Sequence, residues 1–573
     1  MKPTVLVLGS GPIRIGQGIE FDYSCVHCVW SLREMGYRAI IVNNNPETVS
    51  TDFDTGDGLY FEPVTLEDVL DVIAHENPIG VVCQFGGQTA INLAQGLSDS
   101  GIAVLGTSPA AIASAEDREQ FDALLEELDI PRPRGKGVRS LEQAKEIARE
   151  VGYPVLVRPS FVLGGRGMEI VFSEGQLEGF YREAEDANPG QPVLVDKYLL
   201  GKEAEVDVIS DGEETLVPGI MEHIERAGVH SGDSMAVYPP VSLSANVQAQ
   251  MVTSACKIAR ALGVKGLMNI QFVIQDEIAY VLEVNPRASR TVPYLSKVTG
   301  IRMVDLATRC MMGEKLRDMG YASGLWILSG SRSKNLEQGG EAPCALPEFA
   351  DMFGLTERKP PTDAPGNILR ESEFIGGAPS LPAPFLYAIK APVFSFQKLG
   401  RVEPSLGPEM KSTGEILGID NTFEGALYKA LVASGINFKG DGCVLMTVRD
   451  DDKPMALEIA RGLHESGRQI AATPGTADIL QQAGIPCERV NKIQLGSPNI
   501  LDLIMAGRVS LMINTPGLNE TSESEAARIR RACIETGIPC VTSIDTAAAL
   551  IRALEVFANP TSATCLRLEE YFA

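Results

Sequence analysis

The 573-residue chain has no apolar run that approaches the ~20 residues needed to span a bilayer. Basic residues are also scarce, since 50 Lys and Arg stand against 75 Asp and Glu, and the formal net charge is -25. A surface of that sign repels both nucleic acid and anionic lipid. Membrane and nucleic-acid partners are therefore excluded from the expected functions, and any local cluster of Arg and Lys becomes a candidate site for a small anion.

We do not expect a secretory leader, because the apolar residues 5–8 are too few for one and no cleavage site follows them. The 11 cysteines are scattered. Cys25 and Cys28 have zinc-like spacing, but no second pair lies at a plausible distance. We therefore expect a cytoplasmic protein in which these two cysteines pack inside a helix that runs to Met35.

The glycine-rich loop at residues 9–18 lacks the G-x-G-x-x-G spacing of a dinucleotide site. Asn43, Asn44 and Asn45 stand where an acidic residue would bind a ribose. A nicotinamide-dependent dehydrogenase is thus disfavoured, although the backbone N–H groups of the loop could hold a phosphate.

The chain does contain a regular alternation of short β-branched runs and amphipathic stretches in its first hundred residues. The expected strands are residues 5–8, 39–42, 80–83 and 103–105. This order is typical of a parallel βαβ sheet, so the expected fold class is α/β.

Later changes in composition and in the apolar pattern predict further domains. A charged helix after Asp117 leads to a strand at residues 154–158 and another from Glu169. Pro, Gly and Ser dominate residues 326–386, which predicts a long insertion. New strands at residues 443–448, 469–473 and 510–514, with a helix at 454–466, predict a small terminal α/β domain. The expected domains are residues 1–117, 118–325, 326–436 and 437–573.

Two arginines flank a glycine loop in the second domain. Arg158 begins the string RPSFVLGGRG, which ends at Gly167 and includes Arg166. Cations beside flexible glycines are what a site needs in order to approach nucleotide phosphates closely. The alternative is a basic hairpin turn on the surface, and the acidity of the rest of the chain favours the phosphate site.

A predicted hairpin carries a set of oxygen ligands. Gln271 lies in the apolar strand 268–274, and Glu283 and Asn285 share one face of the next strand. Such ligands suit Mg²⁺, and Arg287 and Arg290 follow closely enough to meet a transferring phosphoryl group and an acid. An ordinary polar strand end would explain any one of these residues, but it explains the whole set poorly.

These features, in this order, resemble the ATP-grasp superfamily, whose members activate carboxylates as acyl phosphates. Residues 16–23, 45–52, 158–165, 222–234 and 283–291 resemble the carbamoyl phosphate synthetase large chain. That family is similar to a tandem of two synthetase halves, which phosphorylate bicarbonate and carbamate in turn. This chain resembles the second half over residues 1–325 and 387–573, and the likeness implies a pre-ATP-grasp domain, an ATP-grasp domain and a methylglyoxal-synthase-like allosteric domain.

The resemblance assigns candidate roles residue by residue. It implies an ATP site of Arg118, Arg158, Gly164, Gly165, Lys197, Leu199, Glu203, Gly228, Val229, His230, Ser231, Gln271 and Glu283. It further implies Gln271, Glu283 and Asn285 as ligands of Mg²⁺ or Mn²⁺, with K⁺ as another candidate ion. Arg287 would stabilise the transferred phosphoryl group, and Arg290 would hold carbamate.

The terminal domain implies regulation. Thr473, Thr476, Lys492, Asn514 and Thr515 would bind a nucleotide monophosphate, whereas the alternative for the first turn is a plain helix N-cap at Thr476. The resemblance also places an amino-acid effector, ornithine, on three carboxylates, which on so acidic a chain could equally be solvated surface. These carboxylates are Glu225, Asp233 and Glu409.

The expected reaction joins carbamate and MgATP to give carbamoyl phosphate and ADP, for pyrimidine and arginine biosynthesis. The first synthetase half and the glutaminase small subunit are not in this sequence. We therefore expect a split large chain that acts with both as partners in an oligomer and receives unstable carbamate through a closed interior path. The alternatives are a catalytically silent nucleotide-binding subunit, which the intact hairpin set disfavours, and an ATP-grasp ligase for another carboxylate, which the terminal domain disfavours.

Overall fold

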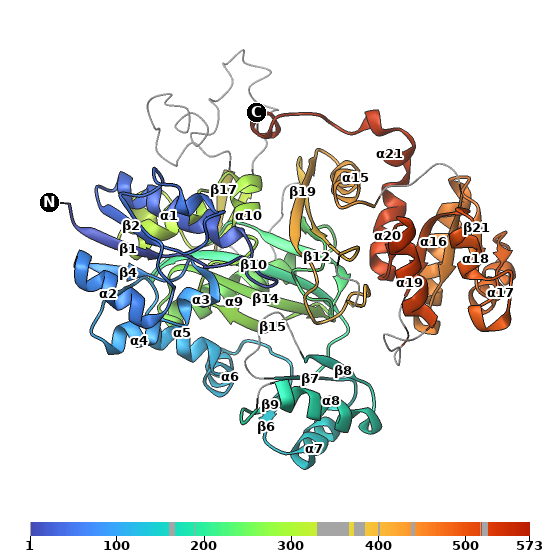
Figure 1. Ribbon diagram of the computed structural model, residues 1–573, viewed down its shortest axis with the longest axis horizontal. Coiled ribbons are helices and arrows are strands. Elements are labelled where there is room, and N and C mark those ends of the chain that lie inside the picture. Colours follow the sequence, from blue (N-terminus) through green and yellow to red (C-terminus); the bar gives the residue numbers. More distant parts are fainter. Residues whose placement is uncertain are drawn as a thin grey trace.

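The computed structural model describes residues 2–159, 167–187, 189–328, 366–371, 384–398, 402–436, 442–515, 517 and 525–572. Strands in these ranges form four sheets. The first and the largest lie side by side, a small sheet lies below the largest, and the last sheet forms the opposite end of the molecule (Figure 1). The predicted α/β class is confirmed.

The first sheet is parallel throughout, with the strand order β3-β2-β1-β4-β5. Its central strands are continuous apolar runs because helices cover both of their faces. The strands are β1 (Thr4–Leu8), β2 (Arg38–Val42), β3 (Gly58–Tyr60), β4 (Gly80–Val82) and β5 (Val104–Leu105). The helices are α1 (Glu20–Glu34), α2 (Leu66–Glu76), α3 (Gly87–Ile91), α4 (Ala94–Asp99) and α5 (Pro109–Glu116).

The four strands predicted for this region are confirmed, and so is the helix that carries Cys25 and Cys28. Both thiols are buried in α1, and burial raises their pKa values. In the described ranges no group of three or more His, Cys, Asp or Glu side chains could hold a metal ion. The two cysteines therefore serve the packing of α1.

The small sheet is antiparallel, with the order β6-β9-β7-β8, and two helices cover it. It follows α6 (Arg118–Glu127), the charged helix predicted after Asp117. Its strands are β6 (Gly135–Val138), β7 (Val155–Pro159), β8 (Glu169–Val171) and β9 (Val193–Lys197), and its helices are α7 (Leu141–Val151) and α8 (Glu174–Ala187). The glycine loop that contains Gly164 and Gly165 lies outside the described residues.

The large sheet follows the path β17-β16-β11-β10-β12-β13-β18-β19, and β14 pairs with both β10 and β15. Its strands are β10 (Lys202–Asp211), β11 (Thr215–Val217), β12 (Ile220–Arg226), β13 (Ala236–Tyr238), β14 (Lys265–Gln275), β15 (Ile278–Asn285), β16 (Gly324–Leu328), β17 (Gly366–Arg370), β18 (Tyr387–Val393) and β19 (Gly414–Asp420). Its helices are α9 (Ala245–Leu262), α10 (Val292–Thr299), α11 (Met303–Met311) and α15 (Phe423–Ala433).

Two details of this sheet bear on the predictions. The hairpin of β14 and β15 is confirmed, and its turn residues Asp276 and Glu277 have φ values of 52° and 62°. Two consecutive positive φ values are typical of a tight two-residue hairpin turn. The predicted insertion at residues 326–386 contains one described strand, because β17 pairs with β16 along its whole length. Because the residues around β17 are rich in glycine and proline, the sequence did not predict this short edge strand.

The last sheet is again parallel, with the order β22-β21-β20-β23-β24. Its strands are β20 (Cys443–Thr447), β21 (Ile470–Ala472), β22 (Glu488–Arg489), β23 (Val509–Asn514) and β24 (Cys540–Val541). Its helices are α16 (Lys453–Glu465), α17 (Pro474–Gln482), α18 (Ile500–Met505), α19 (Glu525–Thr536), α20 (Ile544–Arg552) and α21 (Leu554–Ala558). Short 3₁₀ turns occur at Val49–Thr51, Leu316–Met319, Asp450–Asp452, Ile493–Leu495, Pro560–Ser562 and Leu568–Tyr571.

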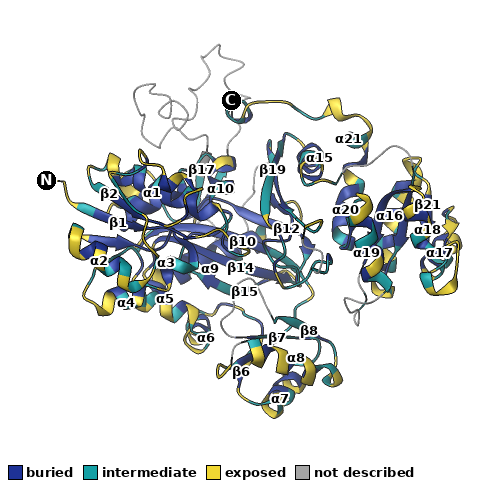
Figure 2. Ribbon diagram, viewed as in Figure 1, coloured by how far each residue is buried: buried dark blue, intermediate teal, exposed yellow. Residues whose placement is uncertain are grey.

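The sheets share their cores. One hydrophobic cluster joins β1 and α1 of the first sheet to α10, α11 and the large sheet, and Ser31 Oγ donates to Asp305 Oδ1 at 2.6 Å across this contact. A second cluster joins the last sheet to β13, β18 and α15, beside an ion pair of Arg226 with Asp545 at 2.8 Å. Figure 2 shows the central strands dark and the outer helix faces exposed. None of the described helices has the length and apolar character to cross a membrane.

Candidate functional site

A cavity of about 860 Å³ lies where the first, small and large sheets meet. Its wall takes residues from α6, from β7 and β9, and from the β14–β15 hairpin. The predicted site residues that line it are Arg118, Arg158, Lys197, Leu199, Glu203, Gly228, Val229, His230, Ser231, Gln271, Glu283, Asn285, Arg287 and Arg290. Residues more than 170 positions apart in sequence therefore meet around one space large enough for a nucleotide and a small acid.

The hairpin brings the predicted metal ligands together. Gln271 and Glu283 are direct partners across the β14–β15 pair, and a register shift follows at once, between Gln271 and Phe272. Asn285 Nδ2 donates to Glu283 Oε1 at 3.0 Å, and Gln271 Nε2 donates to Ser231 Oγ at 3.2 Å. One carboxylate and two amides are a hard-oxygen donor set that fits Mg²⁺, which takes its remaining ligands from water and phosphate. These three residues would hold the ion, and the ion would neutralise charge on the transferring phosphate.

Arg287 is a cation without a carboxylate partner in the described part of the chain. Its guanidinium donates to Gln88 Oε1 at 3.2 Å, to the Ala288 carbonyl at 3.1 Å and to Asn285 Oδ1 at 3.3 Å. Burial lowers the pKa of Arg287, and Glu283 offsets this only in part. A half-buried cation bound only to neutral groups favours an incoming anion. The geometry therefore suits a residue that stabilises the charge of a transferring phosphoryl group.

Arg290 is placed differently. Its Nε donates to Glu20, its Nη1 contacts Met410 Sδ at 3.0 Å, and its Nη2 lies 3.6 Å from Glu415 Oε1. Burial would lower its pKa, but Glu415 and Glu20 outweigh burial and raise it. Arg290 thus already binds two carboxylates of the protein, and its contact with a substrate acid stays a prediction.

The two predicted phosphate-binding arginines share one buried carboxylate. Arg118 Nη2 lies 2.9 Å from Asp196 Oδ1, and Arg158 Nε lies 3.5 Å from Asp196 Oδ2. Arg118 Nε also binds Asp122 at 3.0 Å. The nearby Lys197 is satisfied by backbone, because its Nζ donates to the carbonyls of Gly152 and Tyr153 at 2.9 and 3.0 Å. Asp196 holds both arginines at the cavity wall.

A buried histidine lies between two glutamates that line the cavity. His223 Nε2 is 3.3 Å from Glu205 Oε1, and its Nδ1 is 3.4 Å from Glu203 Oε2. Burial alone would lower the pKa of His223, but these carboxylates raise it to about 9. The imidazolium thus fixes Glu203, a predicted nucleotide contact, at neutral pH.

The five residues predicted to bind a nucleotide effector lie at or just after the carboxyl ends of β21, β22 and β23, the edge where parallel sheets bind ligands. Thr515 Oγ1 accepts from Arg449 N at 2.9 Å, and Asn514 Oδ1 accepts from Arg530 Nη1 at 2.6 Å. Lys492 is exposed. The reading of Thr476 as an N-cap is wrong, because Thr473 precedes α17 and the buried Thr476 hydroxyl accepts from Val448 N at 3.4 Å.

The three carboxylates predicted for an amino-acid effector differ in exposure. Glu225 is buried and accepts from Met235 N at 2.8 Å and from the Thr546 hydroxyl. Asp233 is buried and accepts from Lys411 N and Ser412 N, both at 2.8 Å. Glu409 is exposed. The alternative of solvated surface therefore fails for the first two residues and remains for the third.

Three family models match this chain. The carbamoyl phosphate synthase preATP-grasp domain matches residues 1–114, the carbamoyl-phosphate synthase L chain ATP binding domain matches residues 117–319, and the MGS-like domain matches residues 455–542. The chain belongs to the carbamoyl phosphate synthase large-chain family. The predicted resemblance is confirmed, and the chain is an ATP-grasp ligase of the class that phosphorylates carboxylates.

Solved structures of biotin carboxylases are similar to this chain. The biotin carboxylase domain of Hydrogenobacter thermophilus 2-oxoglutarate carboxylase, in complex with MgADP, ADP and bicarbonate, is similar with a TM-score of 0.53 and 19% identity over 75% of this chain and 90% of that one. Campylobacter jejuni biotin carboxylase is 19% identical over 55% of this chain and 72% of its own, with a TM-score of 0.46. The first likeness shows a common fold and no more.

Sequence reasoning missed several residues at the synthase cavity. Glu205 had a signal, since it stands two residues after Glu203 and shares its face of a strand. Asp196 follows the apolar run 193–195 of β9, where a polar residue is itself a signal. His223 lies in β12 among Glu222, Glu225 and Arg226, so nothing in the sequence distinguished it. Lys390 and Glu415 also line the cavity, but they lie beyond residue 319, where the match to the ATP binding domain ends.

Proposed function

We propose that this chain phosphorylates carbamate with MgATP, as the second synthetase half of a glutamine-dependent carbamoyl phosphate synthetase. The observation that supports it best is the Glu283–Asn285 pair beside Arg287, a cation whose protein partners are all neutral. A carbamate oxygen would attack the γ-phosphorus of ATP in line. The new P–O bond forms as the bond to the β,γ-bridging oxygen breaks, and ADP leaves with the electron pair. No proton moves, because carbamate is already an anion.

The partners follow from the chemistry of the substrate. Carbamate decomposes in water, so a bicarbonate-phosphorylating half and a glutaminase would have to supply it through a protected path. We assign these two roles to partner polypeptides of the same synthetase.

The test is the reverse reaction, which needs no partner: ATP formation from carbamoyl phosphate and MgADP. We expect the parent chain to make ATP and the Glu283→Ala, Asn285→Ala double variant to lose activity about 100-fold, because two of the three residues that would hold the metal are lost. A matched control is Glu178→Ala on the exposed face of α8. A parent that binds MgADP but makes no ATP would instead support the silent nucleotide-binding subunit.

For the terminal domain we propose a nucleotide monophosphate effector, bound at the carboxyl edge of the last sheet. Lys492 is the exposed cation among the predicted contacts, and the hydroxyl and amide groups beside it can orient a phosphate. Lys492→Ala is expected to weaken binding of the monophosphate about 10-fold, as measured by calorimetry. Unchanged affinity would mean that the phosphate binds elsewhere. The control is Arg508→Ala, which removes an exposed ion pair with Glu488 at the opposite, amino-terminal edge of the same sheet.

A further inference from the structure

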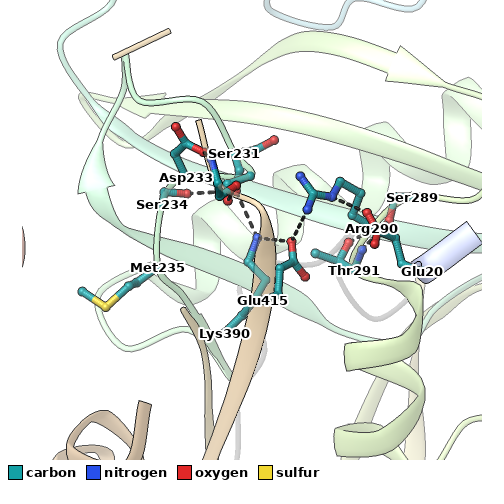
Figure 3. Close-up of polar contacts among 12 residues, drawn as sticks. Glu20, Ser231, Asp233, Ser234, Met235, Ser289, Arg290, Thr291, Lys390 and Glu415 are labelled. Carbon is teal, nitrogen blue, oxygen red and sulfur yellow. Dashed lines mark hydrogen bonds and ion pairs between the residues drawn. The ribbon is translucent and has the colours of Figure 1, made fainter. Parts of the chain in front are cut away.

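A group of four charged side chains lies at the Arg290 end of the cavity. Arg290, Lys390 and Glu415 line the cavity, and Glu20 backs Arg290. Figure 3 shows Lys390 between Ser231 and Glu415, and Arg290 between Glu415 and Glu20. We call these four residues the Glu415 cluster.

Lys390 needs Glu415 in place. It is 2% exposed, in the middle of β18 between two buried apolar neighbours. Its Nζ donates to the Ser231 carbonyl at 3.0 Å and lies 3.7 Å from Glu415 Oε1. A buried ammonium costs several kcal/mol unless a carboxylate compensates it. The pair therefore joins β18 and β19 to the turn at residues 228–231 on the nucleotide side.

Glu415 has an incompletely used oxygen. Oε1 lies 3.6 Å from Arg290 Nη2 and 3.7 Å from Lys390 Nζ, both too far for a hydrogen bond. No donor in the described ranges is within hydrogen-bond reach of this buried atom. Burial raises the pKa of Glu415, although Lys390 and Arg290 oppose it. Because buried acceptors are nearly always hydrogen-bonded, Oε1 is placed to receive a donor from a molecule in the cavity.

We propose that Glu415 Oε1 accepts a hydrogen bond from the amino group of the substrate acid, and so selects an acid that carries an N–H donor. The inference rests on the proposed function and sharpens its substrate class. Carbamate would direct its carboxylate toward Arg287 and the metal, and its NH₂ group toward Glu415. Lys390 and Arg290 act as positioning residues that hold the Glu415 side chain in place. An acid with a methyl group at that place leaves Oε1 buried and unpaired.

The test compares two acyl phosphates that differ only in this group, carbamoyl phosphate and acetyl phosphate, each with MgADP. The β-phosphate oxygen of ADP attacks the acyl phosphate phosphorus, the bond from phosphorus to the acyl oxygen breaks, and carbamate or acetate leaves with the electron pair. We expect the parent to prefer carbamoyl phosphate at least about 10-fold in kcat/KM, the usual discrimination for a hydrogen bond to a charged group. Glu415→Leu should remove the preference, and Glu178→Leu on α8 should keep it.

The ratio of the kcat/KM values for the two acyl phosphates distinguishes a loss of specificity from a general loss of activity. Equal losses on both substrates in Glu415→Leu, with the ratio unchanged, would make Glu415 a structural residue and overturn the inference. A parent that uses both acyl phosphates equally overturns it without any variant. A parent that makes ATP from neither overturns the proposed function, and the inference with it.

Discussion

Arg287→Met is expected to lower kcat for ATP formation about 1,000-fold while MgADP binds with little change. In the proposed reaction the transferred phosphoryl group would develop its charge beside the hairpin, where Arg287 donates only to neutral groups among the described residues. Methionine keeps an unbranched aliphatic stem and removes the charge. The measurement is steady-state ATP formation from carbamoyl phosphate, with MgADP affinity from calorimetry.

Arg287→Lys should recover part of the loss, since it restores a charge but not the planar fork of donors. Arg182→Met, at an exposed ion pair on α8, is the neutral control. If Arg287→Met kept kcat within threefold and instead weakened MgADP, Arg287 would be a ground-state phosphate contact, and the transferred group would need another cation.

His223→Leu is expected to destabilise the protein by about 3 kcal/mol at pH 7, because it leaves Glu203 and Glu205 in the interior without their cation. Urea unfolding followed by far-ultraviolet circular dichroism would report the loss. Replacing the exposed His75 on α2 by leucine should leave the midpoint nearly unchanged.

The pH dependence identifies the cause. The pKa of His223 is raised from 6.5 to about 9 on folding. A raised pKa contributes stability that is fully present below pH 6.5 and is lost as pH rises through about 9. The difference between the parent and His223→Leu should therefore be large at pH 7 and small at pH 10. An equal difference at both values would mean that the histidine contributes packing rather than charge.

The sheets could be predicted because their strands are short apolar runs with clear punctuation. Residues 5–8, 39–42 and 443–448 contain little but buried side chains, and parallel strands covered on both faces take this form. The strand β17 was not predicted because it is only five residues long, lies at the edge of a sheet, and begins with a glycine after a proline. Such a segment carries no periodic signal. Pairing with β16 holds it in place, and such a long-range contact cannot be read from local sequence.

Some residues of the candidate site could likewise be predicted from the sequence, and others could not. Glu283, Asn285 and Arg287 lie within five residues, and Gln271 is brought to them by a single tight turn, so the local pattern was enough to join them. Lys390 and Glu415 reach Arg290 from strands 100 and 125 positions away, along a path that includes long undescribed stretches. Lys390 stands alone between isoleucine and alanine in the sequence, so no local pattern indicates that it lies near Arg290.

The hydrophobic cluster that joins β1 and α1 to α10 and α11 has a consequence for how the chain folds. Neither side of this contact can bury its apolar surface without the other, so both should melt together as one cooperative unit. A fragment that ended after α5 would expose Val29, Leu32 and their neighbours, and it should collect in inclusion bodies when produced alone. Any viable division of this polypeptide has to leave that contact whole.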